Sequence, residues 1–330
     1  MVRRTAPLLL VLLLLSAVAV LASLLLGSVP VAPGDALSAL LGRGDEATVT
    51  IVRDLRLPRA LLGLLVGGAL ALSGAALQAL LGNPLADPYL LGVSGGAACG
   101  TLLALVLGAG AGGLLGTFAL PLASLAGALG AVLLVGLGAS VGGRLDRGRL
   151  LLSGVVVNAL ASAVLLFLLS FGNAADTRGF VFWMLGSLSG ATGEAALSLA
   201  LYSAAGLAVL LPLARAFDAL TLGEETAFTL GVPVETAKRV AYVAASLLAA
   251  AAVAHAGIIG FVGLLVPHLA RRLTRGHRAL LLASFLAGGV LLVASDLLAR
   301  TLFAPNEVSI GAVTALLGAP AFLVLLRRRA

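Results

Sequence analysis

Few side chains in this sequence are of the types that carry out covalent or metal chemistry. The 330 residues include three histidines, one cysteine and 14 acidic residues, and these are scattered along the chain. A catalytic or metal site needs several such groups together, so we expect no catalytic residue, no metal ligand and no cofactor. The sequence also lacks the glycine-rich loop with Lys-Ser/Thr that cradles nucleotide phosphates. The chain is therefore not expected to hydrolyse ATP, and a membrane enzyme is disfavoured.

One polar stretch, Phe217–Val234 (FDALTLGEETAFTLGVPV), has signals for local structure of its own. Thr221 or Gly223 suits the start of a short helix. Glu224 and Glu225 then fall in its first turn, where the helix dipole favours acids.

The same stretch contains signals for the end of that helix and for the next one. We expect the helix to end at Leu230, because Gly231 suits the left-handed position just past a helix. Pro233 and Glu235 suit the first turn of the following helix. The stretch is thus either a helical loop that receives a partner or one that only connects two spans.

Composition places the chain in a membrane. It is 61% hydrophobic and 11% charged, with a mean hydropathy of +1.15, whereas roughly a quarter of the residues of a soluble domain are charged. Its apolar runs are continuous rather than alternating, which argues against a β-barrel. Its 42 glycines suit close helix packing in lipid, and the single Cys99 allows no disulfide within one chain.

The predicted fold class is an all-α polytopic membrane protein with a single transmembrane domain over residues 1–330. The first apolar run, of about 20 residues, is too long for a signal-peptide core. A span needs about 20 apolar residues, or fewer where protein shields it. The ten expected spans are 7–27, 58–81, 90–109, 117–142, 150–171, 194–213, 237–256, 258–271, 279–299 and 309–326.

The basic residues set the expected orientation. With ten spans and a cytoplasmic N-terminus, 15 of the 21 basic residues fall inside, among them Arg3, Arg4, Arg328 and Arg329 near the ends. Both termini and the loop 215–236 are then cytoplasmic. Because the net charge of +7 is concentrated beside spans, it does not indicate a nucleic-acid partner.

Two helix breaks follow the second span. Asn83-Pro84 and Asp87-Pro88 interrupt the helix within six residues. Irregular backbone at a membrane boundary is tolerated where it is buried in protein or lines a watery cavity. This segment therefore either borders a pathway or forms a tight inner turn.

Charged residues also occur at the expected outer rim. Arg56 and Arg59 flank Pro58 there, either as interface anchors or in a functional role. Asp296 and Arg300 are four residues apart and are expected to form an ion pair on one helix. Isolated polar residues elsewhere in the spans are expected to have structural roles: Gln78, Asn158, His255 and His268.

Several motifs occur in a fixed order: RLPR (56–59), SGAALQALLGNPLADPYLLGVSGGA (73–97), FWMLGSLSG (182–190), LTLGEETAFTLGV (220–232), GIIGFVGLLVPHLARRL (257–273), SDLLAR (295–300) and IGAVTALLGAPAFLVLL (310–326). From about residue 56 to the end, the chain resembles the FecCD family, permease subunits of ATP-binding-cassette importers for iron-siderophores, haem and cobalamin.

The resemblance implies a ten-span, cobalamin-importer-like permease fold in a prokaryotic cell membrane. It implies a homodimer, or a heterodimer, with the pathway between subunits, two ATPase subunits inside and a substrate-binding protein outside. Residues of the coupling loop that seat in the ATPase are then Gly223, Glu224, Glu225, Ala227, Leu230 and Gly231. Arg56, Arg59 and Arg300 match the docking positions for the binding protein. Asn83, Pro84, Arg147 and Gly148 fall at the pathway and inner gate, although this chain lacks the small hydroxyl residues expected near Arg147.

An ion-coupled secondary transporter is the alternative. It would need carboxylates near the middle of spans and internal repeats, and the sequence shows neither. The residues do not distinguish siderophore, haem and cobalamin as substrates.

Overall fold

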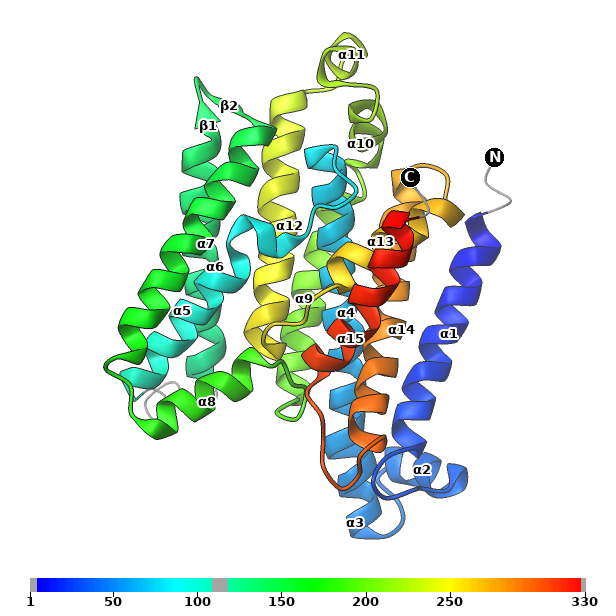
Figure 1. Cartoon of the computed structure of the whole chain (residues 1–330). Coiled ribbons are helices and arrows are strands. Elements are labelled where there is room, and N and C mark those ends of the chain that lie inside the picture. Colours follow the sequence, from blue (N-terminus) through cyan, green and yellow to red (C-terminus); the bar gives the residue numbers. More distant parts are fainter. Residues whose placement is uncertain (1–4, 109–117, 328–330) are drawn as a thin grey trace.

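The computed structural model of the chain describes residues 5–108 and 118–327. These residues form a bundle whose long helices run along its length, with shorter helices at both ends (Figure 1). Arg3, Arg4, Arg328 and Arg329, which contribute to the expected charge asymmetry, lie outside the described residues.

The long helices account for most of the bundle, and short elements join them. The helices are α1 (Thr5–Leu25), α2 (Pro33–Leu40), α3 (Glu46–Val49), α4 (Leu57–Leu81), α5 (Val93–Val106), α6 (Ala119–Ala139), α7 (Arg147–Leu169), α8 (Ala174–Met184), α9 (Gly193–Leu210), α10 (Ala214–Leu220), α11 (Glu224–Thr229), α12 (Val234–Ala256), α13 (Val262–Leu273), α14 (His277–Thr301) and α15 (Ile310–Arg327). A π-helical segment covers Thr50–Arg56, a 3-10 helix covers Pro88–Leu91, and β1 (Ser140–Val141) pairs with β2 (Arg144–Leu145).

Each of the ten expected spans corresponds to a helix. Among the described residues, seven helices are long and apolar enough to cross a membrane unaided: α1, α4 with the helical turns before it, α6, α7, α9, α12 and α14. The other three, α5, α13 and α15, are shorter apolar helices. α13 has only 12 residues and is shielded by protein, since most of its length is buried between its neighbours. The predicted all-α polytopic fold is confirmed.

Helix α4 forms the centre of the bundle, and glycines allow its neighbours to approach it. A Cβ at Gly67 would lie 2.2 Å from the carbonyl oxygen of Gly288 on α14. A Cβ at Gly74 would lie 1.8 Å from the carbonyl oxygen of Gly263 on α13. Both distances are impossible for a side chain, so glycine is required for these contacts.

The segment before α4 is helical as well. α4 begins at Leu57 with Pro58 in its first turn, and helical structure from Glu46 runs into it without a break and continues to Leu81. The π-helical turns of Thr50–Arg56 immediately precede the proline. A proline ring clashes with the preceding turn of a regular α-helix, and a wider turn there accommodates it.

The two ends of the bundle carry different short elements. We call them the α11 end, which holds α10, α11 and the β1–β2 hairpin, and the α2 end, which holds α2, α3 and α8 (Figure 1). The first turn of α1 and the last turn of α15 lie at the α11 end. Gly142 and Gly143 both have positive φ and form the two-residue hairpin turn, as such turns require.

The polar stretch expected to begin at Phe217 is only partly polar in the structure. Residues 214–220 form α10, and Phe217 is fully buried, with its ring centroid 5.8 Å from that of His277. The exposed loop therefore begins after Leu220. Phe217 anchors it to the bundle because burying a large aromatic ring is strongly favourable.

Candidate functional site at the α11 end

Helix α11 forms where the sequence predicts it. Gly223, with φ +106°, precedes its first residue, and Glu224 and Glu225 occupy its first turn. Leu230 is the last half-helical residue, and Gly231 follows with φ +82°.

Two hydrogen bonds close the end of α11. The N–H of Val232 donates to the carbonyl of Ala227 at 3.0 Å, and the N–H of Gly231 donates to the carbonyl of Phe228 at 2.9 Å. This pair is the Schellman motif, which needs a left-handed residue where Gly231 stands. A six-residue helix is thus fixed at both ends by glycines.

The two faces of α11 have different surroundings. Ala227 is 0% exposed and packs into the chain's own core. Phe228 is 75% exposed and Leu230 is 64% exposed, and Glu225 is exposed as well. Ala227 therefore attaches the helix to the bundle, while Phe228 and Leu230 present apolar surface to whatever lies beyond the α11 end.

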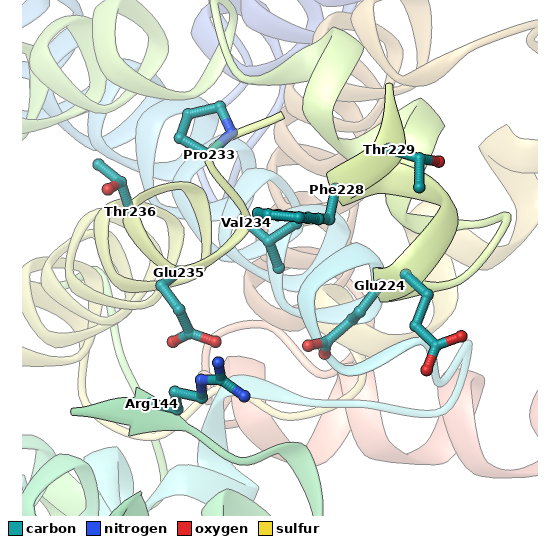
Figure 2. A pocket seen from close by; sticks show the side chains of 9 residues that line it. Arg144, Glu224, Phe228, Thr229, Pro233, Val234, Glu235 and Thr236 are labelled. Atoms are coloured by element: carbon teal, nitrogen blue, oxygen red, sulfur yellow. The ribbon is translucent and has the colours of Figure 1, made fainter. Parts of the chain in front are cut away.

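A pocket of about 570 Å³ lies between α11 and the start of α12 (Figure 2). Phe228 and Val234 supply apolar wall, and the charged ends of Arg144, Glu224 and Glu235 gather along one side. A pocket with both apolar and charged walls, beside exposed apolar side chains, has the composition of a protein-docking surface.

An ion-pair network beside this pocket joins three helices, α7, α11 and α12. Glu224 Oε1 lies 2.8 Å from Arg147 Nε at the start of α7, and Glu224 Oε2 lies 3.0 Å from Lys238 Nζ on α12. Lys238 Nζ is also 2.9 Å from Glu235 Oε1, and Glu235 Oε2 accepts a hydrogen bond from the N–H of Leu145 at 2.8 Å. Glu224 from the predicted coupling helix and Arg147 from the predicted gate are thus in direct contact.

Lys238 is the centre of this network, and sequence reasoning assigned it no site role. Its side chain is 3% exposed, and a buried ammonium group is tolerated only when it is paired. The spacing of Glu235 and Lys238, three residues apart on a helix, is the only local signal for their pairing. The contacts of Lys238 with Glu224 and of Arg147 with Glu224 are long-range and carry no such signal.

A second cavity, of about 370 Å³, lies behind the network. It is lined by Arg147 and Pro84 from the predicted gate, by Gly223 from the coupling loop, and by Gln78, Gly82 and Arg271. The guanidinium of Arg147 lies directly over Gly82, the left-handed residue that ends α4, so close that a Cβ there would be 2.9 Å from Nη1. A cation at the end of a helix is favoured by the helix dipole. Arg147 therefore contacts the end of α4 and the start of α11 at once.

The other two predicted gate residues are not among those that line this cavity. Asn83 Oδ1 accepts a hydrogen bond from the N–H of Leu85 at 2.9 Å, which shapes the turn after α4. Gly148 is exposed in the first turn of α7.

The broken segment after α4 also contains a half-buried acid. Asp87 Oδ1 accepts a hydrogen bond from the N–H of Tyr89 at 2.8 Å and starts the 3-10 helix. Burial raises the pKa of Asp87 to about 6, since desolvation disfavours the carboxylate more than this bond favours it.

Helix α10 adds a contact that sequence reasoning missed. Asp218 Oδ1 accepts a hydrogen bond from the N–H of His277 at 2.9 Å and lies 2.7 Å from Nδ1 of the same residue. His277 is the first residue of α14. Because a carboxylate is favoured at a helix start, this contact holds α10, and with it the base of the α11 loop, against α14.

At the α2 end, the three predicted docking arginines are held within the chain. Arg56 donates to the carbonyls of Leu24, Leu25 and Val29, and it is buried. Arg300, also buried, donates to the backbone carbonyl and the hydroxyl of Ser23, both at 2.7 Å. These contacts satisfy backbone carbonyls at and just after the end of α1, and they bind it to the π-helical segment before α4 and to α14.

Arg59 bridges two acids. Its Nη2 lies 2.9 Å from Asp296 Oδ1 and 3.1 Å from Glu307 Oε2. The expected pair of Asp296 and Arg300 is present at 3.5 Å. Asp296 lies closer to Arg59, at 2.9 Å, than to Arg300. Because Arg59 is on another helix, the spacing of residues along one helix could not predict this pair.

Other isolated polar residues bond neighbouring elements, as expected. Gln78 Nε2 donates to the carbonyl of Leu264 at 3.2 Å, and Asn158 Nδ2 donates to that of Tyr89 at 3.1 Å. His255 Nε2 lies 3.3 Å from Ser198 Oγ. Within residues 5–108 and 118–327, no group of three or more His, Cys, Asp or Glu side chains is placed to hold a metal ion.

Comparison with known proteins assigns the class. The model of the FecCD transport family matches residues 12–328 of the chain. The chain therefore belongs to the FecCD transport family.

Two of the relatives are named for the import of cobalamin or vitamin B12. The chain is 45% identical over 289 residues to the cobalamin import system permease protein BtuC of Halobacterium salinarum, which covers 86% of this chain and 75% of that protein. It is 41% identical over 330 residues to the vitamin B12 import system permease protein BtuC of Salmonella typhimurium, which covers 99% of this chain and 97% of that one.

Solved structures agree on the fold. A structure described as an inward-facing conformation of an ABC transporter of metal-chelate type matches with a TM-score of 0.84 and 31% identity, covering 98% of this chain and 99% of the other. PsaBC from Streptococcus pneumoniae matches with a TM-score of 0.55 and 17% identity, covering 81% of this chain, which is a likeness of fold alone.

Proposed function

We propose that this chain is the permease subunit of an ATP-binding-cassette importer in a prokaryotic cell membrane. Membership of the FecCD family and the BtuC relatives support this function. The single observation that carries the mechanism is the position of α11. A capped helix with exposed Phe228 and Leu230 is tied through Glu224 to Arg147 at the predicted gate.

Energy comes from a partner in this proposal. The chain has no phosphate-binding glycine loop, so two separate ATPase subunits dock at the α11 end and hydrolyse ATP. The coupling site is Gly223, Glu224, Glu225, Ala227, Leu230 and Gly231. Within it, Glu225 and Leu230 meet the partner, Ala227 fixes the helix to the core, and the glycines set its shape.

The α11 end is cytoplasmic in this proposal. The excess of basic residues in the segments on that side supports the orientation, because such residues are retained inside. Both termini are then cytoplasmic as well.

The pathway lies between two copies of the chain, a homodimer, in this proposal. Asn83, Pro84, Arg147 and Gly148 border its inner mouth on each copy. Pro84 and Arg147 line the 370 Å³ cavity, Asn83 shapes the turn after α4, and Gly148 is exposed in the first turn of α7.

The α2 end receives a substrate-binding protein through the rim that contains Arg56, Arg59 and Arg300. Since these three are paired internally, acidic residues of the binding protein would compete with Asp296 and Glu307 for Arg59. Arg56 and Arg300 would shape this rim by holding the end of α1.

The proposed substrate class is cobalamin or a metal chelate such as an iron-siderophore or haem. The relatives named for cobalamin and vitamin B12, and the structural neighbour of metal-chelate type, support this class. The binding protein would select among its members.

The test is to purify the chain with its ATPase and binding protein, identify the ligand that the binding protein holds, and measure uptake of that ligand into vesicles. We expect uptake that requires ATP and is indifferent to an uncoupler. Uptake that is abolished by an uncoupler and independent of ATP would instead identify an ion-coupled secondary transporter.

A further inference from the structure

A groove of about 380 Å³ runs between α9 and α12, and none of its described lining residues lines either cavity at the α11 end. Its lining is almost wholly carbon, from side chains such as Val209, Val243 and Leu247. Among the described residues that line it, Arg239 is the only charged one.

The width of the groove is set by the residues at which α9 and α12 meet. At Gly206 the two helices touch, since a Cβ there would lie 2.6 Å from Leu248 Cδ1. Beside this contact the small side chains of Ala205 and Ala244 leave the space between the helices unfilled. Leu248 thus narrows the groove at the level of Gly206, and Arg239 lies nearer the start of α12.

The length of the groove matches one leaflet. From Arg239 to Leu248 α12 rises about 13 Å, at about 1.5 Å per residue. This distance is close to half of the roughly 30 Å hydrocarbon core of a bilayer. With Arg239 at the headgroup level, a groove of this length would reach to near the middle of the membrane.

The charge of Arg239 is available to a ligand. One of its nitrogens donates to the carbonyl of Gly143 in the hairpin turn, which holds the guanidinium in place. A guanidinium has five N–H donors, so others remain. The nearby carboxylate of Glu235 is engaged by Lys238 at 2.9 Å and by the N–H of Leu145 at 2.8 Å.

We propose that this groove binds an anionic phospholipid of the leaflet at the α11 end, with an acyl chain between α9 and α12 and the phosphate at Arg239. A carbon-lined slot half a bilayer deep, with one cation at its mouth, matches a lipid in both shape and charge. The leaflet is the cytoplasmic one if the orientation proposed above holds. The binding itself does not depend on transport.

The experiment uses tryptophan fluorescence in vesicles. Trp183 is the only tryptophan, so a Trp183→Phe background gives a silent chain. Val243→Trp then places a probe in the groove, and Leu201→Trp places a matched probe on α9 that does not line it. Quenching of each probe is measured with a brominated anionic phospholipid and with a brominated zwitterionic one at equal mole fractions.

We expect the groove at the Val243→Trp probe to bind the anionic lipid about fivefold more strongly than the zwitterionic one, as measured by quenching. This is the effect of one basic residue near the membrane surface. Arg239→Gln should remove this preference. The matched change Arg278→Gln, at an exposed arginine on the same end of the molecule, should leave it intact.

Three results would overturn the proposal. One is an equal preference at the Leu201→Trp probe, which would mean ordinary boundary lipid. Another is a preference that survives Arg239→Gln. The third is a groove probe that no lipid quenches, which would mean that another protein surface covers the groove. None of these depends on the ATPase, so the importer function is tested separately.

Discussion

Arg147 Nε lies 2.8 Å from Glu224 Oε1, so the start of α7 and the start of α11 are joined by a direct ion pair. Arg147 also lies over Gly82 at the end of α4. In the importer proposed above, a displacement of α11 by the ATPase would therefore act on the end of α4 and on the proposed mouth of the pathway through one side chain.

The first prediction concerns this pair. Arg147→Gln and Glu224→Gln should each reduce the stimulation of ATP hydrolysis by the loaded binding protein about two- to fivefold. This fold-change corresponds to the free energy of a partly exposed ion pair. If the two residues act as one unit, the stimulation in the double variant should be no lower than in the more strongly impaired single variant. The measurement is hydrolysis in the reconstituted complex, with Arg149→Gln, an exposed arginine two residues along, as control. Losses that multiply in the double variant would mean that the two residues act independently.

The second prediction concerns Lys238. Lys238→Met keeps the apolar stem but leaves Glu224 and Glu235 without their shared cation, at a cost of about 1–3 kcal/mol because both acids retain some contact with solvent. We expect thermal unfolding of the purified chain at a temperature several degrees lower.

Adding Glu235→Gln to Lys238→Met shows whether the stability is lost through unpaired charge or through altered packing. The amide oxygen can still accept from the N–H of Leu145, and one unneutralised carboxylate is removed. Part of the lost stability should return. If the double variant is as unstable as Lys238→Met alone, packing rather than charge explains the effect.

The third prediction separates the two faces of α11. Phe228→Ser and Leu230→Ser change exposed side chains, so the free energy of unfolding should shift by less than about 0.5 kcal/mol. Binding of the ATPase should weaken about five- to thirtyfold, as for the loss of an apolar anchor at an interface. Retention of the ATPase on the purified chain measures this, and full retention by both variants would leave α11 as a connector.

Ala227→Trp is the contrasting variant. Because Ala227 is buried in the chain's own core, the larger ring should destabilise the fold by about 1–3 kcal/mol rather than block the partner selectively. Gly231→Val should disorder the end of α11, since a β-branched residue is strained at φ +82°.

The sequence predicts what depends on local signals. The spans follow from continuous apolar runs, and α11 follows from its glycines and its two acids, all within one short stretch. The π-helical turns before Pro58 have no such signal, because their form depends on the whole region before α4.

The contacts that build the candidate site are long-range, and this is why sequence reasoning missed them. Arg147 and Glu224 are separated by the whole of α7 and α9, and no local pattern links them. The sequence around Arg56 indicates a free cation at a membrane rim, yet Arg56 donates to backbone carbonyls at the end of α1. Any residue type could supply such carbonyls, so the sequence carries no signal for this contact. The burial of Ala227 likewise depends on which face of a six-residue helix meets the bundle.

The fourth prediction concerns orientation. In a Cys99→Ala background, single cysteines at Leu37 and Ala175, both exposed at the α2 end, should react with an impermeant thiol reagent added to intact cells. A cysteine at Thr226, exposed on α11, should react only after the membrane is opened. Labelling of position 226 in intact cells would reverse the orientation and place the proposed ATPase site outside.

The last prediction separates the three arginines at the α2 end. Arg56→Ala and Arg300→Ala remove buried donors from the end of α1, so each should lower the free energy of unfolding by about 1–3 kcal/mol. Arg59→Ala is expected to act on docking as well, since it alone of the three lies between Asp296 and the exposed Glu307.

Binding of the substrate-binding protein should weaken in the Arg59→Ala variant, and its dependence on salt should decrease, because exposed charges are screened beyond about 8–10 Å. A titration of the binding protein at several salt concentrations measures both effects. Glu307→Gln is the matched control. It frees Arg59 from one internal partner, so docking should stay the same or become tighter. If Arg59→Ala docks normally at every salt concentration, Arg59 serves with Arg56 and Arg300 only to hold the chain together.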